Sequence, residues 1–249
     1  LDDLYSEEQK LIRDSISSWV IKKIKPVIDE HFIKSTIPNF LVKDLSEIGA
    51  FGFIIPEEYG GLNMDYVSYG LMMQELERGD SSIRVMASIQ TSLVMFAINM
   101  FGSAEQKNEY LPKLSSGEYL GAFGLTEPNY GSNPASMHSY YKEDGDYIII
   151  NGSKMWIGNS ENADIAIVWV KDESLNVRGV IIDKNKITNF DTNSFKDKWS
   201  FRASKTGELI FSDSSTLKSQ ILPKSTSIKN AYQCLNIGRY AVACGSIGI

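Results

Sequence analysis

Residues 117–125, with the sequence Gly-Glu-Tyr-Leu-Gly-Ala-Phe-Gly-Leu, mark the point where the hydrophobic pattern of the chain changes. Before this stretch, apolar residues recur every three or four positions, which is typical of amphipathic helices. After it, they form short runs bounded by turn residues, which is typical of strands. Helical spacing returns near residue 229. The sequence therefore predicts an α+β fold: an N-terminal all-α helical domain (residues 1–116), a middle β-barrel or β-sandwich domain (117–228), and the first helix of an incomplete C-terminal α-helical bundle domain (229–249).

The N-terminal half contains clear helix signals. Ser6–Gln9 and Ser103–Gln106 have the pattern of a capping box, in which the first and fourth side chains each bind the other residue's backbone N–H. Helical spacing also covers residues 41–48, 65–78 and 81–100, and the last of these is long and apolar. No window of about 18 uncharged apolar residues occurs, so we expect no membrane span.

The middle region contains a strong hairpin signal. Asn151-Gly152 lies between apolar runs at 147–150 and 154–157. This dipeptide favours a two-residue turn between antiparallel strands, so a hairpin is predicted there. Further short strands are predicted at 165–170, 180–182 and 208–211.

The charge balance of the chain limits its partners. Its 249 residues include 25 lysines and arginines and 31 aspartates and glutamates, which gives a net charge of −6. This argues against nucleic acid as a partner, because a nucleic-acid binder needs a basic surface. A phosphate-bearing small ligand stays compatible, since a few amides and one arginine are enough to bind it.

Metal ligands and a targeting segment are also not expected. The cysteines and histidines lack metal-ligand spacing, so no metal site is predicted: Cys234, Cys244, His31 and His138. The acidic N-terminus does not resemble a signal peptide. We therefore expect a cytoplasmic protein, or one of the mitochondrial matrix if the source is eukaryotic.

Four stretches together form a recognisable pattern. They are Pro-Glu-Glu-Tyr-Gly-Gly (56–61), the elements Gly-Ser, Gln-Lys and Tyr-Leu-Pro within 102–112, Phe-Gly-Leu-Thr-Glu-Pro with Gly-Ser (123–132), and Asn-Gly, Lys and Trp-Ile within 151–157. In this combination they resemble the acyl-CoA dehydrogenase family, over nearly the whole chain but only over the first two domains of the family. Within it, the similarity is greatest to the glutaryl-CoA dehydrogenases and rests on Glu75–Arg78, Arg84, Gln90, Ser92–Met95, Leu235, Asn236 and Arg239.

The resemblance implies FAD as the cofactor and points to residues that would bind it. The backbone of Leu125 and Thr126 and the Thr126 hydroxyl suit the pyrimidine edge of the flavin, with Phe123 on the same strand. Ser132 suits a phosphate oxygen, because Gly131 before it permits a close approach of the backbone. Taken alone, the segment would be an ordinary strand-to-loop turn.

Trp156 is the candidate for packing against the flavin ring, and Ile157 and Gly158 follow it on the same strand. In the family a threonine stands at the position of Gly158, and its hydroxyl approaches the flavin nitrogen that accepts hydride. Glycine offers only its amide, so we expect flavin binding and flavin potential to differ. We assign the other three tryptophans to the hydrophobic core: Trp19, Trp169 and Trp199.

Arg84 lies on the long apolar helix, where an unpaired charge would be costly. One interpretation is a structural ion pair. The other, implied by the resemblance, is that Arg84 binds the distal carboxylate of a dicarboxylic acyl group, with Glu77 nearby. Val85 replaces the serine that follows this arginine in the glutaryl-type enzymes, so one polar contact to the substrate is missing.

The C-terminal helix carries the remaining candidates for substrate binding. Asn236 and Arg239 share one of its faces, next to Leu235. In the family this face contacts the CoA part of the ligand, and Ser132 also approaches it. The alternative is an ordinary surface helix. Residues 198–204 resemble a family segment as well, and we interpret its charges as structural or interfacial.

The carboxylate that removes the α-proton is not among these candidates. Most family members supply it from late in the C-terminal helical domain, and a minority supply it from the position of Gly238 in this chain. We therefore expect the catalytic base beyond Ile249. The sequence is interpreted as a shortened form of a longer enzyme that is inactive on its own.

The predicted function of the full-length protein is FAD-dependent α,β-dehydrogenation of an acyl-CoA thioester. Glutaryl-CoA is the favoured substrate, with decarboxylation to crotonyl-CoA. The resemblance further implies an electron-transfer flavoprotein as electron acceptor and a homotetramer. Two alternatives stay open. One is a short- or branched-chain acyl-CoA dehydrogenase in which Arg84 is structural. The other is a catalytically inactive binding module of the same family, which Gly158 and the missing base favour.

Overall fold

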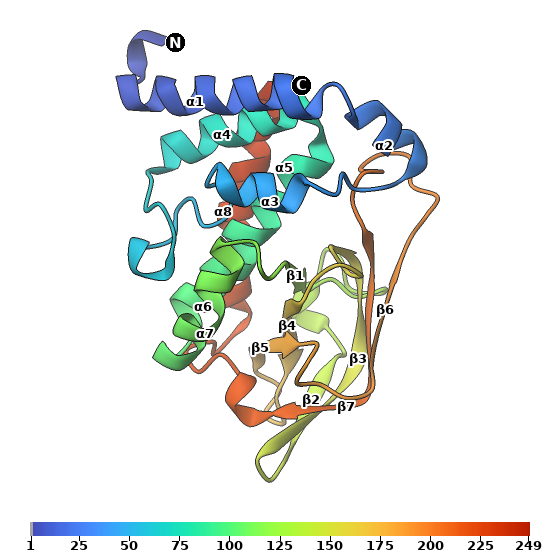
Figure 1. Ribbon diagram of the computed structural model, residues 1–249. Coiled ribbons are helices and arrows are strands. Elements are labelled where there is room, and N and C mark those ends of the chain that lie inside the picture. The colour runs from blue at the N-terminus through green and yellow to red at the C-terminus, as the bar shows by residue number, and fades with distance from the viewer. Residues whose placement is uncertain (1) are drawn as a thin grey trace.

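The computed structural model describes residues 2–249, which form a helical part beside a curled β-sheet (Figure 1). The helices before the sheet are α1 (Glu7–Trp19), α2 (Ile28–Lys34), α3 (Leu41–Glu47), α4 (Tyr66–Gly79), α5 (Ser81–Ser88), α6 (Phe96–Phe101) and α7 (Ala104–Ser115). The helix after the sheet is α8 (Ile228–Gly245), which returns to pack on the helical part. The predicted order of a helical region, a β region and a C-terminal helix is confirmed.

Both predicted capping boxes are present. The Ser6 hydroxyl accepts a hydrogen bond from the Gln9 backbone N–H, and the Gln9 side chain accepts one from the Ser6 N–H, at 3.2 and 3.1 Å. Ser103 and Gln106 make the same pair of bonds at 3.2 and 3.0 Å. Because each box satisfies two N–H groups that lack helical partners, it fixes the residue at which its helix begins.

The long apolar helix runs from Ser81 to Phe101 and contains a π-helical segment, η4 (Ile89–Met95), between α5 and α6. In the part of the chain that the structure describes, it alone has the length and composition needed to cross a membrane. However, 78% of its most apolar window is buried inside the protein, as in the core helix of a globular domain. This helix contains the candidate site residues Arg84 and Val85, whereas Glu77 lies on α4.

The sheet is mixed and contains β1 (Gly121–Gly124), β2 (Tyr140–Asp144), β3 (Tyr147–Gly158), β4 (Ile165–Lys171), β5 (Val177–Asp183), β6 (Phe190–Ser194) and β7 (Thr206–Leu217). Its strand order is β1-β4-β2-β3-β7-β6, and β5 pairs with β4. β1 runs parallel to β4, whereas the long ladder between β3 and β7 is antiparallel. The start of β1, at Gly121, packs on Val94 of η4, and the end of β3, at Gly158, packs on Ile89.

The hairpin predicted at Asn151-Gly152 is wrong. These residues lie inside β3, which pairs with β7 on both sides of them and shifts register between Ile150 and Gly152. Gly152 has a φ of 133°, and a Cβ there would collide with Ser139, so the glycine serves a bulge. The actual turn between β2 and β3 contains Gly145, which has a φ of 59°.

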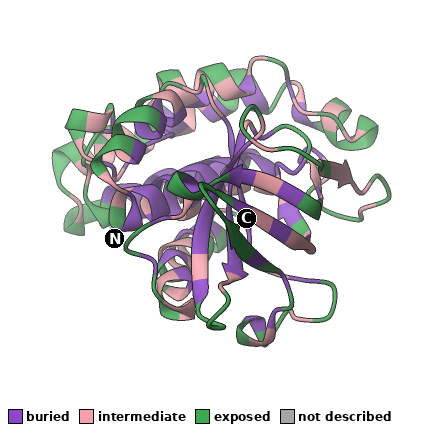
Figure 2. Ribbon diagram, turned by 90° about the horizontal axis from the view of Figure 1, so that it is seen from below, coloured by how far each residue is buried: buried purple, intermediate pink, exposed green. Residues whose placement is uncertain are grey.

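The hydrophobic core joins the helical part to the sheet, and in Figure 2 the buried residues lie on the inner faces of the helices and in the central strands. Trp169 on β4 is fully buried, and its ring contacts Phe101 of α6 and Phe123 of β1 at centroid distances of 6.3 and 6.1 Å. The assignment of Trp169 to the core is confirmed. The assignment of Trp199 is wrong, because its side chain is 98% exposed.

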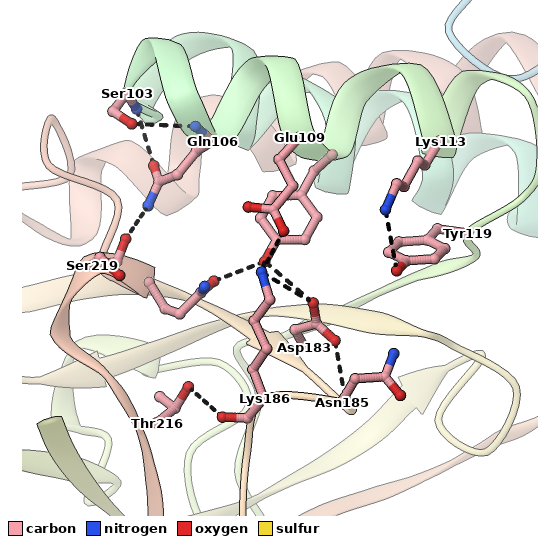
Figure 3. Close-up of polar contacts among 12 residues, drawn as sticks. Ser103, Gln106, Glu109, Lys113, Tyr119, Asp183, Asn185, Lys186, Thr216 and Ser219 are labelled. Atoms are coloured by element: carbon pink, nitrogen blue, oxygen red, sulfur yellow. Dashed lines mark hydrogen bonds and ion pairs between the residues drawn. The ribbon is translucent and has the colours of Figure 1, made fainter.

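A polar junction reinforces this contact on the side of α7 that faces the sheet (Figure 3). The Tyr110 hydroxyl lies 3.3 Å from Asp183 Oδ2 and accepts a hydrogen bond from Lys186 Nζ at 3.0 Å. Lys186 also forms an ion pair with Glu109, and burial raises the pKa of Tyr110. The Gln106 amide reaches across to donate to the Ser219 carbonyl at 2.8 Å. The junction therefore fixes the helices relative to the sheet, and with them the walls of the site between the two parts.

Candidate functional site

Two clefts meet at Trp156. The first, of about 330 Å³, gathers most of the residues predicted from the sequence: Phe123, Leu125, Thr126, Gly131, Ser132, Trp156, Ile157, Leu235 and Arg239. The second, of about 570 Å³, adds Val85 on its helical wall and Gly158 on its strand wall, whereas the predicted residues Glu77, Arg84 and Asn236 line neither cleft. Sequence reasoning missed Pro134 and Tyr232 in the first cleft, and Ile89 and Phe195 in the second.

The segment after β1 forms one wall of the first cleft. Thr126 is half-buried, and its carbonyl accepts a hydrogen bond from the Met155 N–H of β3 at 2.8 Å. The chain then turns at 127–130 and exposes Gly131 and Ser132. A Cβ at Gly131 would approach only Thr126 Cγ2, at 4.0 Å, so packing within the protein does not require glycine there. The segment thus leaves open space beside Ser132.

Trp156 is held in an unusual backbone conformation. Its φ is 64°, and the register of β3 against β7 shifts between Met155 and Ile157. Bulges of this kind turn a side chain away from its regular direction, and a left-handed φ costs free energy for a bulky residue. The indole is 63% exposed and lies 4.8 Å from the Phe195 ring. The strand therefore presents a large aromatic surface to both clefts.

Gly158 of β3 and Ile89 of η4 pack directly against each other at the second cleft. A Cβ at position 158 would overlap the terminal methyl group of Ile89, which is buried at the start of η4. The space that a side chain at position 158 would fill is therefore already occupied by a residue of the helical part. No local pattern in the sequence indicated this partner.

This pairing predicts a coupled response to mutation. Gly158→Thr is expected to lower the free energy of unfolding by about 1–3 kcal/mol, because Ile89 has to move. In the double variant with Ile89→Ala, the two losses should be less than additive, since the space is then free. Urea unfolding of both single variants and the double variant measures the coupling. Strictly additive losses would show that the two side chains do not compete.

Glu77 and Arg84 meet although Asp80 separates their helices. Arg84 Nε forms a hydrogen-bonded ion pair with Glu77 Oε2, and the two side chains are only 6% and 3% exposed. Gly245 of α8 covers the pair, since a Cβ there would lie 3.1 Å from Arg84 Nε. Arg84 is not among the residues that line the two clefts at Trp156, although Val85 next to it lines the second.

The predicted face of α8 is only partly directed into the site. Leu235 and Arg239 line the first cleft, whereas Asn236 does not. Asn236 instead accepts a hydrogen bond from Arg239 Nη1 at 3.0 Å. A Cβ at Gly238 would contact Leu93 of η4 at 3.2 Å. Within residues 2–249, no aspartate or glutamate lines the first cleft.

The segment 198–204 is held by its own charges. Lys198 Nζ donates to the carbonyls of Phe201 and Ser204, each at 2.6 Å. Arg202 donates to the carbonyls of Phe32 and Ile33 in α2, at 2.9 and 3.1 Å. These contacts fix the loop that borders the second cleft, and they agree with the structural interpretation of its charges.

Comparison with known proteins explains why these residues converge. The family model described as acyl-CoA dehydrogenase, N-terminal domain, matches residues 6–118, and the model described as acyl-CoA dehydrogenase, middle domain, matches residues 122–214. The chain belongs to the acyl-CoA dehydrogenase family. The resemblance found in the sequence is thereby confirmed, and the clefts lie among the residues of these family domains and α8.

Individual relatives agree with this assignment. A glutaryl-CoA dehydrogenase of Desulfococcus multivorans is 34% identical, over 100% of this chain and 66% of its own length. A short-chain specific acyl-CoA dehydrogenase of Rattus norvegicus is 30% identical, over 98% of this chain and 60% of its own length. A structure of a glutaryl-CoA dehydrogenase from Mycobacterium smegmatis in complex with FADH2 matches with 38% identity and a TM-score of 0.96, over 99% of this chain and 63% of that one. The chain thus spans less than two thirds of the length of these relatives.

Proposed function

We propose that the chain forms the flavin-binding and acyl-CoA-binding part of an FAD-dependent acyl-CoA dehydrogenase that acts on glutaryl-CoA. The observation that carries this proposal is the first cleft, which brings Thr126, Ser132 and Trp156 of the β region to Arg239 of α8. A hydroxyl-rich turn, a wide aromatic surface and a cation in one cleft suit a ligand with a planar ring and phosphate groups. The relative crystallised with FADH2 has the same fold at a TM-score of 0.96.

The residues present fit the parts of FAD. Thr126 would bind the pyrimidine edge through its hydroxyl and amide, and the exposed indole of Trp156 would pack on the ring. Ser132 would bind a phosphate oxygen, and the open space beside Gly131 gives that group room. When bound, FAD supplies the acceptor for the hydride that leaves the acyl chain. The protein side chains orient the ring and exclude water from it.

Arg84 supports a dicarboxylic substrate. Within the described chain its guanidinium is hydrogen-bonded only through Nε, although it carries five N–H donors. It is 5% exposed and lies on an apolar helix, so a second anion near its free donors would be held in a site of low polarity. The distal carboxylate of glutaryl-CoA would provide this anion. After α,β-dehydrogenation, the distal carboxyl group would leave as CO2, its bonding electrons would pass into the conjugated thioester, and uptake of a proton at the γ-carbon would give crotonyl-CoA.

The remaining parts of the activity are assigned to chain and partners outside residues 1–249. The first cleft contains no carboxylate, and Gly238 supplies none, so we place the catalytic base in the part of the relatives' length that this chain does not span. Electrons would pass to an electron-transfer flavoprotein, and the assembly would be a homotetramer.

A short- or branched-chain acyl-CoA dehydrogenase is the second candidate. Val85 favours it, because an apolar side chain borders the second cleft where the glutaryl-type enzymes have serine. The short-chain specific relative at 30% identity is consistent with the same view. In that case the pair of Arg84 and Glu77 would be structural.

The test uses the natural full-length protein purified without added flavin. We expect a yellow protein with a flavin absorption spectrum that is bleached anaerobically by glutaryl-CoA faster than by butyryl-CoA. Faster bleaching by butyryl-CoA would select the second candidate. A colourless protein that takes up no FAD, or a flavoprotein that no acyl-CoA reduces, would overturn the proposed function.

A further inference from the structure

A lysine ammonium lies in the interior of the β region, between the two walls of the first cleft. Lys154 on β3 is 0% exposed and stands two residues before Trp156. Its stem passes Gly124 of β1, where a Cβ would approach Lys154 Cγ at 3.2 Å. A charge buried this completely costs several kcal/mol unless it is paired and hydrogen-bonded. The hydrogen-bond partners of Lys154 therefore indicate which part of the structure its charge holds in place.

The partners of Lys154 all belong to the segment that follows β1. Its Nζ donates to Glu127 Oε1 at 2.8 Å and to the Leu125 carbonyl at 3.3 Å. A third contact reaches Met137 Sδ at 3.7 Å. One ammonium thus contacts both the beginning and the end of the stretch 125–137, which contains Thr126, Gly131 and Ser132.

Glu127 extends these contacts to the far end of the same segment. Its carboxylate accepts hydrogen bonds from the backbone N–H groups of His138 and Ser139, at 2.7 and 2.9 Å. Burial acts to raise the pKa of Glu127, but Lys154 and these donors outweigh it and the net shift is downward. Burial lowers the pKa of Lys154 to about 8, against the opposing effect of Glu127. Both groups are therefore charged at neutral pH.

We propose that Lys154 and Glu127 are positioning residues that set the geometry of the FAD-binding segment 125–132 relative to Trp156 on β3. Neither residue lines the first cleft. The inference rests on the proposed function for the identity of the ligand, and it goes beyond that function by naming what determines the shape of its site.

The charges of Lys154 and Glu127 favour a positioning role over a purely stabilising one. An apolar pair of similar volume is often as stable as a buried ion pair, or more stable. However, apolar side chains cannot bind the Leu125 carbonyl or the N–H groups of His138 and Ser139 in fixed directions. Outside the pair, one backbone bond, from Met155 N–H to the Thr126 carbonyl, joins β3 to this segment beside the cleft.

The test separates stability from geometry. Lys154→Met and Glu127→Leu are made singly and together in the full-length protein, with Lys142→Met on the exposed face of β2 as a matched control. We expect each single variant to unfold at lower urea concentration, and the double variant to recover most of that loss. The double variant should nevertheless bind FAD about tenfold more weakly. Its flavin absorption band should also be shifted.

Hydrogen exchange of the backbone amides tests the role of the ion pair independently of FAD binding. Amide hydrogen exchange in 125–139 of the flavin-free double variant should be faster than in the wild type, whether or not FAD binds. A double variant with wild-type FAD affinity, spectrum and exchange would reduce the pair to a structural role and overturn the inference. If the double variant does not fold, Glu127→Gln is measured instead. Unchanged amide exchange at His138 and Ser139 in that variant would also overturn the inference. A wild-type protein without FAD affinity would overturn the proposed function alone, because the exchange result stands by itself.

Discussion

Arg84→Met is expected to lower the free energy of unfolding by about 3–5 kcal/mol, because it leaves the Glu77 carboxylate buried without its partner. The side chains of Arg84 and Glu77 are 6% and 3% exposed, and the Ser81 hydroxyl, which also donates to Glu77, is neutral and does not replace the lost charge. Gly245 of α8 covers the pair and leaves little room for relaxation. Urea unfolding monitored by circular dichroism measures this loss. Arg13→Met, which removes surface pairs with Asp2 and Asp14, is the control and should unfold like the wild type.

The same substitution separates the two candidate substrates. The double variant Arg84→Met with Glu77→Leu removes both charges, and it should regain most of the lost stability. If Arg84 binds the distal carboxylate, this stable variant still loses turnover of glutaryl-CoA and keeps turnover of butyryl-CoA. A double variant that retains its preference for glutaryl-CoA would show that the ion pair is structural.

Trp169→Ala is expected to cost about 3–5 kcal/mol of stability, because it leaves a large cavity in a fully buried site. The indole lies between Phe101 of the helical part and Phe123 of β1, so the cavity opens where the two parts meet. Phe123 lines the first cleft, and the loss of its support should also weaken FAD binding. Thermal unfolding and FAD titration measure the two effects.

Trp169→Phe is the matched control for this cavity. The indole Nε1 has no hydrogen-bond partner among the described residues, so phenylalanine removes volume without breaking a hydrogen bond. Its cost should therefore be clearly smaller than that of alanine. Equal losses of stability in Trp169→Ala and Trp169→Phe would indicate that the volume of the ring does not stabilise the contact between the helical part and the sheet.

Local signals in the sequence predicted local structure well. The capping boxes at Ser6 and Ser103 act within four residues, and both are present. The change of period near Gly117 also locates the transition from helices to strands correctly. Each of these features depends on neighbours in the chain, which the sequence contains directly.

Features that depend on distant contacts were predicted poorly. Asn151-Gly152 has the composition of a turn, but the ladder with β7 and the proximity of Ser139 make it a bulge. Trp199 is 98% exposed, and its neighbour Lys198 and nearby Arg202 bind distant or local backbone carbonyls, which the apolarity of a residue does not reveal.

The candidate site follows the same division. The residues of the first cleft were predicted as a group through the family pattern, and the structure brings them together. The left-handed φ of Trp156 and the overlap of Gly158 with Ile89 could not be predicted, because they depend on the register of β3 and on a helix far away in sequence. Glu77 was expected near Arg84 only through the resemblance, because their contact depends on the angle between α4 and α5 around Asp80.

The position of α8 has a consequence for the order of events during biosynthesis. One wall of the first cleft leaves the ribosome with residues 123–132, but Leu235 and Arg239 follow only after the whole sheet. The ladder of β3 with β7 joins Tyr147 to Leu217, and closing so long a loop is slow. α8 then docks through Tyr240, whose hydroxyl donates to the Tyr66 carbonyl at 2.6 Å. We therefore expect FAD to bind late, after the helical part and the sheet have folded. When FAD is scarce, we expect the folded protein to accumulate without its cofactor.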